Sequence, residues 1–85
     1  MKHIRQDYNE RIQDVAGLIP DDEPVMLFRA QDKYAARVLV HYAQLIENDD
    51  EATAESLEVA KRAREQSQNM LEWDRKKLPD VPEGA

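Results

Sequence analysis

A short run of polar side chains, residues 29–33, combines the groups that proteins use to bind small anions. Arg29 can hold a phosphate or a carboxylate with two parallel hydrogen bonds. Gln31 offers both a donor and an acceptor to the edge of a base. Asp32 precedes an expected helix, and the free amides at a helix start favour a negative charge. The predicted ligand-binding residues are therefore Arg29, Gln31, Asp32 and Lys33, with a small anion as the ligand.

The same residues allow a purely structural interpretation. Arg29 could instead pair with Asp32 or with the acids at positions 21–23. In that case the carboxylate of Asp32 would only cap the helix that follows it. The sequence leaves both interpretations open.

Catalytic and metal chemistry find little support in the remaining residues. The histidines are His3, in a segment expected to be poorly ordered, and His41, on the polar side of a helix. The two serines lie on a row of small helical residues, and the chain has no cysteine. A nucleophile needs a base within hydrogen-bond reach. The acidic run 47–51 lacks the alternating ligands and the glycine of a calcium loop. We expect no enzyme, no cofactor and no metal site.

The length and charge of the chain narrow the classes of partner. Eighty-five residues make one small domain, which would be marginally stable as a monomer. Self-association is therefore expected, and a homo-oligomer is predicted. The net charge of −6 and the pI near 4.8 argue against direct binding to DNA or RNA phosphates. No apolar run approaches the roughly 18 residues of a membrane span, so we expect a cytoplasmic protein without membrane contact.

Apolar spacing predicts two helices, at residues 32–47 and 51–76. The first carries its apolar side chains at three- and four-residue steps, at Ala35, Val38, Leu39, Tyr42, Leu45 and Ile46. The second carries a central row of small residues, Ser56, Ala60, Ala63 and Ser67, in which Tyr42 could lie. Asn48 is expected to end the first helix in a left-handed conformation, and Asp50 to cap the second. The short connection predicts an antiparallel helical hairpin.

The segments before the helices are less regular. Residues 4–15 are equally compatible with a helix and with a short strand around residues 11–13. Pro20 and Pro24 disfavour helix in the residues before them, so 19–31 should be extended. The segment 25–29, which begins with the apolar run 25–28, should be a strand covered on both faces, paired with the N-terminal segment or with a second subunit.

The whole chain is thus predicted to be mainly α, with α+β as the alternative. Residues 1–76 should form a single domain, with a lead-in at 1–18, an extended segment at 19–31 and the hairpin at 32–76. Residues 77–85 should form a flexible tail, because they contain two prolines and a glycine.

Residues 19–32, IPDDEPVMLFRAQD, are similar to a pattern in small uncharacterised phage and prophage accessory proteins. That pattern, IPxDEPVxLxRAQD, precedes two helices and a tryptophan near the C-terminus, a place that Trp73 fits. The resemblance covers roughly residues 10–75, and it implies a phage protein that counters host defence. Two functions are then open: sequestration of a nucleotide-type host signal, or inhibition of a basic host protein by the acidic surface, as anti-CRISPR proteins do. A structural homodimer without a ligand is the third interpretation.

Overall fold

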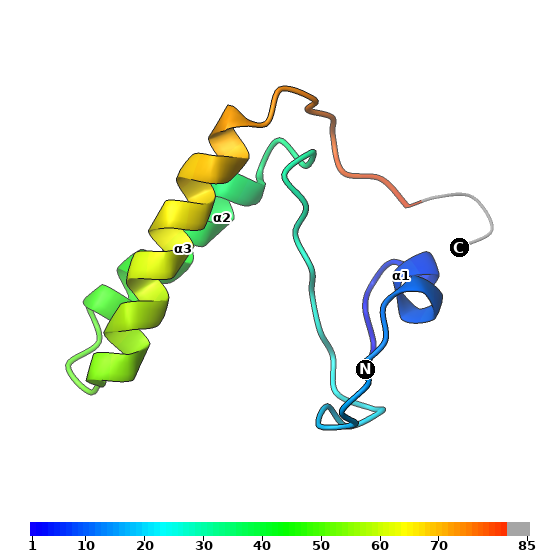
Figure 1. Ribbon diagram of the computed structural model, residues 1–85, viewed down its shortest axis with the longest axis horizontal. Helices are drawn as coiled ribbons and strands as arrows, with labels where there is room; N and C mark the ends of the chain where they lie inside the picture. The colour runs from blue at the N-terminus through cyan, green and yellow to red at the C-terminus, as the bar shows by residue number, and fades with distance from the viewer. Residues whose placement is uncertain (82–85) are drawn as a thin grey trace. The chain divides into compact units, whose positions relative to one another are not determined.

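The computed structural model describes residues 1–81, which contain three α-helices (Figure 1). They are α1 (Gln6–Arg11), α2 (Ala35–Glu47) and α3 (Ala54–Glu72). Within residues 1–81 the only β-type pairing consists of two isolated bridges. The prediction of a mainly helical chain is confirmed. The chain divides into two compact units, residues 28–79 and residues 1–27 with 80–81, and each is described by itself.

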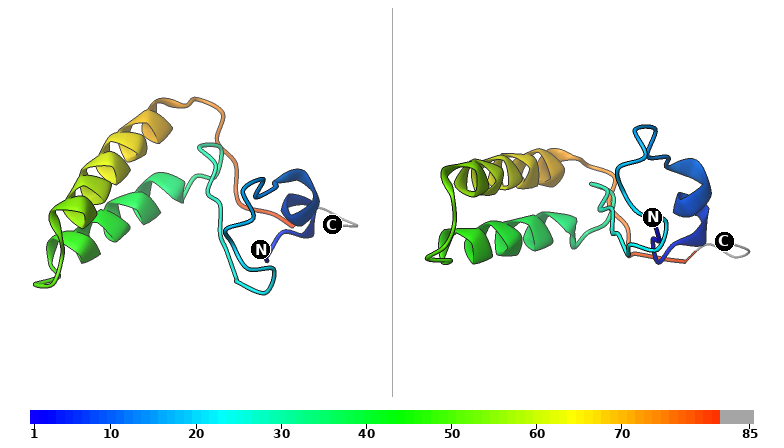
Figure 2. Two further views of the ribbon diagram at one scale, coloured as in Figure 1. Left: turned by 60° about the horizontal axis from the view of Figure 1, so that its bottom comes forward. Right: turned by 90° about the horizontal axis from the view of Figure 1, so that it is seen from below.

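The helices α2 and α3 pack side by side in opposite directions, as the predicted hairpin requires (Figures 1 and 2). Small side chains fill the contact between them. On α2 the buried residues are Ala35, Ala36 and Ala43; on α3 they are Ala60, Ala63, Ser67 and Met70. Short side chains on both helices let the backbones approach closely. The row of small residues therefore lies where the sequence predicted it, but Tyr42 is 48% exposed and does not lie in it.

Both helices are shorter than the sequence predicted. Asp32 does not cap α2, because its carboxylate accepts a 2.8 Å hydrogen bond from the Tyr34 amide in a turn before the helix. Asn48 ends α2 with φ −91°, in the right-handed region and not the left-handed one. The helix α3 ends at Glu72, four residues before the predicted end at residue 76, and its C-cap Trp73 is extended.

The cap of α3 also differs from the prediction. Thr53, not Asp50, is its N-cap, and the Thr53 hydroxyl accepts a 3.0 Å hydrogen bond from the Ser56 amide. The neighbouring Asp49 carboxylate accepts from the Glu51 amide instead. The acidic residues of the connection thus shape its turn, and a threonine closes the first turn of the helix.

Two lysines that follow α3 fasten the open end of the hairpin. The Lys77 amide donates to the Gln31 carbonyl at 2.7 Å, and the Lys33 amide donates to the Lys77 carbonyl at 3.0 Å. The ammonium of Lys76 donates to the carbonyls of Ala30 and Met70. Lys77 is therefore held by backbone pairing, although it was predicted to begin a flexible tail; residues 82–85 of that tail lie outside the described chain.

The N-terminal unit is built around a short helix and a chain reversal. Of the two alternatives left open for residues 4–15, a helix forms, but it spans only Gln6–Arg11 and buries Tyr8 alone. Ile4 and Val15, which the helical stripe would have buried, are 72% and 93% exposed. Gly17 adopts φ +68° and donates to the Asp14 carbonyl at 3.1 Å, forming a turn.

The segment 25–29 is extended but is not the strand that the sequence predicted. Its β-type pairing lies at its start, beside the parallel bridge between Lys2 and Pro24, where the Val25 amide donates to the Lys2 carbonyl at 2.8 Å. The N-terminal segment is thus the partner, through residue 2 and not through residues 11–13. Met26 and Leu27 are 49% and 40% exposed, so the run is not covered on both faces.

None of the helices in residues 1–81 combines the length and the apolar character needed to cross a membrane.

Candidate functional site

An open groove of about 510 Å³ lies at the fastened end of the hairpin, wholly within residues 28–79. Its apolar lining residues are Phe28, Ala30, Met70 and Trp73, and its polar ones are Arg29, Gln31, Gln66, Asn69 and Arg75. Residues before α2 thus meet residues from the last two turns of α3 and the segment after it. Two arginines and no acidic residue occur in this part of the described chain's surface, although the whole chain carries a net charge of −6.

The packing below the groove explains why these segments meet. Met70 is 8% exposed and clusters with Ala35 and Ala36 of α2, and Phe28 and Ala30 pack against that cluster. Burial of these apolar groups draws residues 28–30 onto the end of α3. The Lys76 ammonium, bonded to the Ala30 carbonyl at 2.9 Å, fixes the same segment by a polar contact. Arg29 and Gln31 flank Ala30 in this segment, which turns where the Asp32 amide donates to the Arg29 carbonyl at 3.0 Å.

Arg29 is exposed, and among the described residues of 28–79 its guanidinium forms no ion pair. The alternative in which Arg29 pairs with Asp32 is therefore not what the structure shows, since the Asp32 carboxylate bonds to the Tyr34 amide. Gln31 is half-buried beside Arg29. An unpaired guanidinium next to a carboxamide can still form its full set of hydrogen bonds with an incoming anion.

Trp73 is the aromatic ring of the α3 side of the groove, and Arg75 lies over it. The Arg75 guanidinium carbon lies 4.2 Å from the centre of the Trp73 ring. Arg75 also lies 3.8 Å from Asp74, whose side chain is 92% exposed, so that ion pair is weak. In the same groove the Asn69 amide donates to the Gln66 side-chain oxygen at 3.1 Å. A planar ring and a cation thus stand beside two amides that can read hydrogen-bonding edges.

The four predicted ligand-binding residues separate into two pairs. Arg29 and Gln31 line the groove, whereas Asp32 and Lys33 are not among its lining residues. Lys33 is exposed, with its ammonium 5.4 Å from the centre of the Tyr34 ring. The free amides expected at Asp32 are also not part of the groove, because α2 begins three residues later.

Sequence reasoning missed four polar or aromatic lining residues: Gln66, Asn69, Trp73 and Arg75. The signal that could have found them is periodicity, because Gln66 and Trp73 are seven residues apart on the expected helix and so share one stripe. What the spacing could not provide was the extended turn after Glu72 that brings Arg75 back over Trp73.

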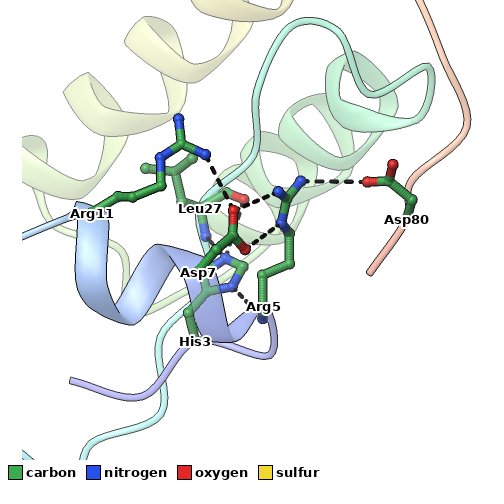
Figure 3. A network of polar contacts seen from close by, with 6 residues as sticks. All are labelled: His3, Arg5, Asp7, Arg11, Leu27 and Asp80. Atoms are coloured by element: carbon green, nitrogen blue, oxygen red, sulfur yellow. Dashed lines mark hydrogen bonds and ion pairs between the residues drawn. The ribbon is translucent and has the colours of Figure 1, made fainter. Parts of the chain in front are cut away.

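A second polar cluster lies in the N-terminal unit (Figure 3). Arg5 donates to both carboxylate oxygens of Asp7, at 3.0 and 2.7 Å, and Arg11 donates to one of them at 3.1 Å. Arg5 also reaches Asp80 at 3.4 Å. The hydrogen bonds from Arg5, with a smaller contribution from Arg11, lower the pKa of Asp7 to about 2. The carboxylate therefore stays charged well into the acid range.

His3 lies beside this cluster and is buried, at 8% exposure, although its segment was expected to be poorly ordered. Its Nδ1 lies 2.9 Å from the Arg5 amide nitrogen, and its Nε2 lies 2.8 Å from the Leu27 amide nitrogen (Figure 3). Its ring meets Tyr8 edge to face at 4.9 Å. These contacts use the ring to tie residues 3–5 to residue 27, which is a structural role.

Searches for similar proteins add no relative: no family model matches the sequence, and neither the curated proteins nor the solved structures contain a match. Among the described residues no cluster of histidines and carboxylates has the arrangement of a metal site.

Proposed function

We propose that this protein is a non-enzymatic binding protein that takes up a small anionic ligand with a planar ring, of the nucleotide type, in the groove between residues 28–31 and the end of α3. One observation carries the proposal. In an acidic chain, the groove gathers two arginines and the chain's single tryptophan and contains no acidic lining residue in the described part. Anion binding and ring stacking are the two interactions that such a set supports.

Each part of a nucleotide has a matching group. The unpaired guanidinium of Arg29 is suited to a phosphate, through two parallel N–H bonds. The Trp73 face, with Arg75 at 4.2 Å, offers a stacking surface for a base. The carboxamides of Gln31, Gln66 and Asn69 line the same groove and offer donors and acceptors to base edges. Asp32 and Lys33 are left outside this binding set.

The similarity of residues 19–32 to phage and prophage accessory proteins supplies the proposed biological setting. In that setting the ligand is a nucleotide-type signal of a host defence system, and binding removes it from solution. The protein has no catalytic part in this proposal: the ligand leaves unchanged, and the bound amount depends on protein concentration and affinity alone.

The test uses the intrinsic fluorescence of Trp73, because the chain has no other tryptophan. Titration with AMP, cyclic AMP and a cyclic dinucleotide, checked by calorimetry, should quench the emission and saturate. Adenosine and inorganic phosphate, which each supply half of the ligand, should bind more weakly than AMP. Absence of saturable binding by any nucleotide at millimolar concentration would overturn the proposal.

Arg29→Ala gives the decisive variant. Loss of a charge-assisted contact costs about 1.5–3 kcal/mol, which corresponds to a weakening of tenfold or more. Arg62→Ala is the matched control, because Arg62 is an exposed arginine of α3 that pairs with Glu58 and lies four residues before Gln66, outside the groove lining. Equal binding by both variants would exclude Arg29 as the anion-binding residue.

The inhibitor of a basic host protein remains the second candidate, and the acid-rich connection favours it. Residues 47–58 contain six acidic residues and no lysine or arginine. This candidate would be favoured if a host protein binds the wild-type chain but not the Asp49→Lys variant, and if no nucleotide binds.

A further inference from the structure

The large apolar side chains of the hairpin lie outside its core. The residues buried between α2 and α3 are mainly alanines, and no large side chain of the described chain is fully buried. Val38, Tyr42 and Leu45 of α2 are 37%, 48% and 58% exposed, and Val59 of α3 is 45% exposed. A helix pair that buries alanines and exposes these groups gains little from the hydrophobic effect on its own.

These four side chains, called here the outer patch, lie on one flank of the hairpin. Steps of four and three residues place Val38, Tyr42 and Leu45 on one stripe of α2. The opposite flank is identified by a shallow groove where Arg37 and His41 of α2 meet Leu71 of α3. At 100° per residue, Tyr42 points away from the side of α2 that carries Arg37 and Gln44.

On α3, Val59 is placed by the heptad spacing. Val59, Gln66 and Trp73 are seven residues apart, so they follow one stripe along the helix. Gln66 and Trp73 line the ligand groove. The outer patch and the groove therefore lie along the same flank, with the patch toward the connection between the helices and the groove toward their fastened end.

Charge is divided between the two ends of the hairpin. The end formed by residues 47–58 carries six acidic residues and no lysine or arginine. The other end, residues 28–37 and 73–79, carries six basic residues and two acidic ones. Two hairpins packed face to face in opposite directions place each acidic end over a basic end. Packed in the same direction, they place like charges together.

We propose that a second copy of this chain covers the outer patch, with the two hairpins antiparallel in a four-helix bundle related by a twofold axis. The axis passes near Tyr42, so that α2 of one copy packs on α2 of the other. Such an interface is self-complementary, as a twofold dimer requires, and it buries the patch of both copies. The acidic connection of each copy then borders the groove of the other.

The first test compares two substitutions on α3 by sedimentation equilibrium of the full chain. Val59 and Leu57 are both 45% exposed, but they lie about 160° apart around the helix. Wild type should sediment at twice the 9.9 kDa chain mass. Val59→Asp should raise the dimer dissociation constant about tenfold or more, because the interface would have to bury a charge. Leu57→Asp should leave it unchanged.

Two results would overturn the proposal. One is a wild-type chain that remains monomeric at roughly 100 μM, where even a weak dimer should form. The other is an equal weakening of the dimer by Val59→Asp and Leu57→Asp. Because Val59→Asp could unfold the hairpin, circular dichroism accompanies each measurement, and cross-linking decides the case independently.

The cross-linking test exploits the absence of cysteine in the chain. Under mild oxidation Tyr42→Cys should form a disulfide-linked dimer, because the twofold axis brings the two copies of position 42 together, whereas Leu57→Cys should not. A mixture of Val38→Cys and Leu45→Cys should cross-link faster than either alone, because the antiparallel arrangement sets position 38 opposite position 45. Faster self-linking of each would show parallel packing and contradict the proposal.

Discussion

The hydroxyl of Ser67 on α3 donates a 2.9 Å hydrogen bond to the backbone carbonyl of Ala36 on α2. Both residues are buried, at 2% and 6% exposure. This bond is a buried polar link between the two helices, whereas the pair of Arg64 and Glu47 joins them at the surface. The close approach that alanines permit brings a side chain as short as serine within reach of the neighbouring backbone.

Ser67→Ala should lower the free energy of unfolding by about 1 kcal/mol, the usual net value of one hydrogen bond. Urea unfolding followed by circular dichroism at 222 nm measures it. Gln68→Ala is the control, because Gln68 is exposed and its side chain makes only a 3.5 Å contact with Glu72. A variant at Ser67 as stable as wild type would contradict the structural role of this bond.

Ala60→Leu should destabilise the hairpin by about 1–3 kcal/mol, because extra methylene groups cannot enter a closely packed contact without moving the helices apart. Ala60 is 1% exposed. The neighbouring Lys61→Leu introduces the same side chain on the exposed side and should change stability by less than about 0.5 kcal/mol. Equal effects in urea unfolding would show that α2 and α3 are not packed through their alanines.

Thr53→Ala should cost about 1 kcal/mol, because it removes the N-cap of α3 and leaves the Ser56 amide without its acceptor. Asp50→Ala should have little effect, since Thr53 and not Asp50 provides the cap. Helix content and thermal midpoint of the two variants give the comparison. The reverse order of stability would place the start of α3 at the earlier residue.

Gly17→Ala should destabilise the N-terminal unit by about 1 kcal/mol through backbone strain alone. Gly17 has φ +68°, and no atom lies within 4 Å of where a Cβ would be built, so no clash contributes. Amide exchange of Ile19, whose N–H donates to Asp14 at 2.6 Å, should accelerate about fivefold. Gly17→Asn should have a smaller effect, because asparagine tolerates this conformation better.

The N-terminal unit should lose stability in acid through Asp7. The pKa of Asp7 is about 2 in the folded chain, below its ordinary value of 3.8, because Arg5 donates to the carboxylate. The lowered pKa stabilises the folded state above about pH 4, and this contribution disappears as the pH falls from there through 2. Carboxyl NMR titration should give a midpoint near 2, and Asp7→Asn should remove this part of the acid dependence. A midpoint near 3.8 would show that the Arg5 pair does not form.

The sequence predicted the helices correctly where apolar spacing repeats over several turns. Val38, Leu39 and Ile46 mark α2, and the row from Ala60 to Ser67 marks the contact side of α3. The ends were predicted less well, because local chemistry competes there. Asp32 had every property of a cap, and its carboxylate does accept from the amide two residues on, but that amide belongs to a turn paired with Lys77, and α2 begins only at Ala35.

The groove was only half visible in the sequence. Arg29 and Gln31 stood out because they follow an apolar run, but Trp73 and Arg75 come more than 40 residues later. Their proximity depends on the antiparallel hairpin and on the extended turn at Trp73 together. Asp32 and Lys33 were included because they are adjacent in sequence, but the chain turns between them and the groove: the Asp32 amide donates to the Arg29 carbonyl, and the Ala35 amide donates to the Asp32 carbonyl.

The pairing of Lys77 with Gln31 and Lys33 has a kinetic consequence for any ligand of the groove. Its two backbone hydrogen bonds hold the segments on either side of the groove at a fixed separation before a ligand arrives. Little conformational entropy then remains to be lost on binding, so affinity depends mainly on the contacts themselves. Association should accordingly be a single fast phase whose rate rises linearly with ligand concentration, with no slower step from ordering of the groove.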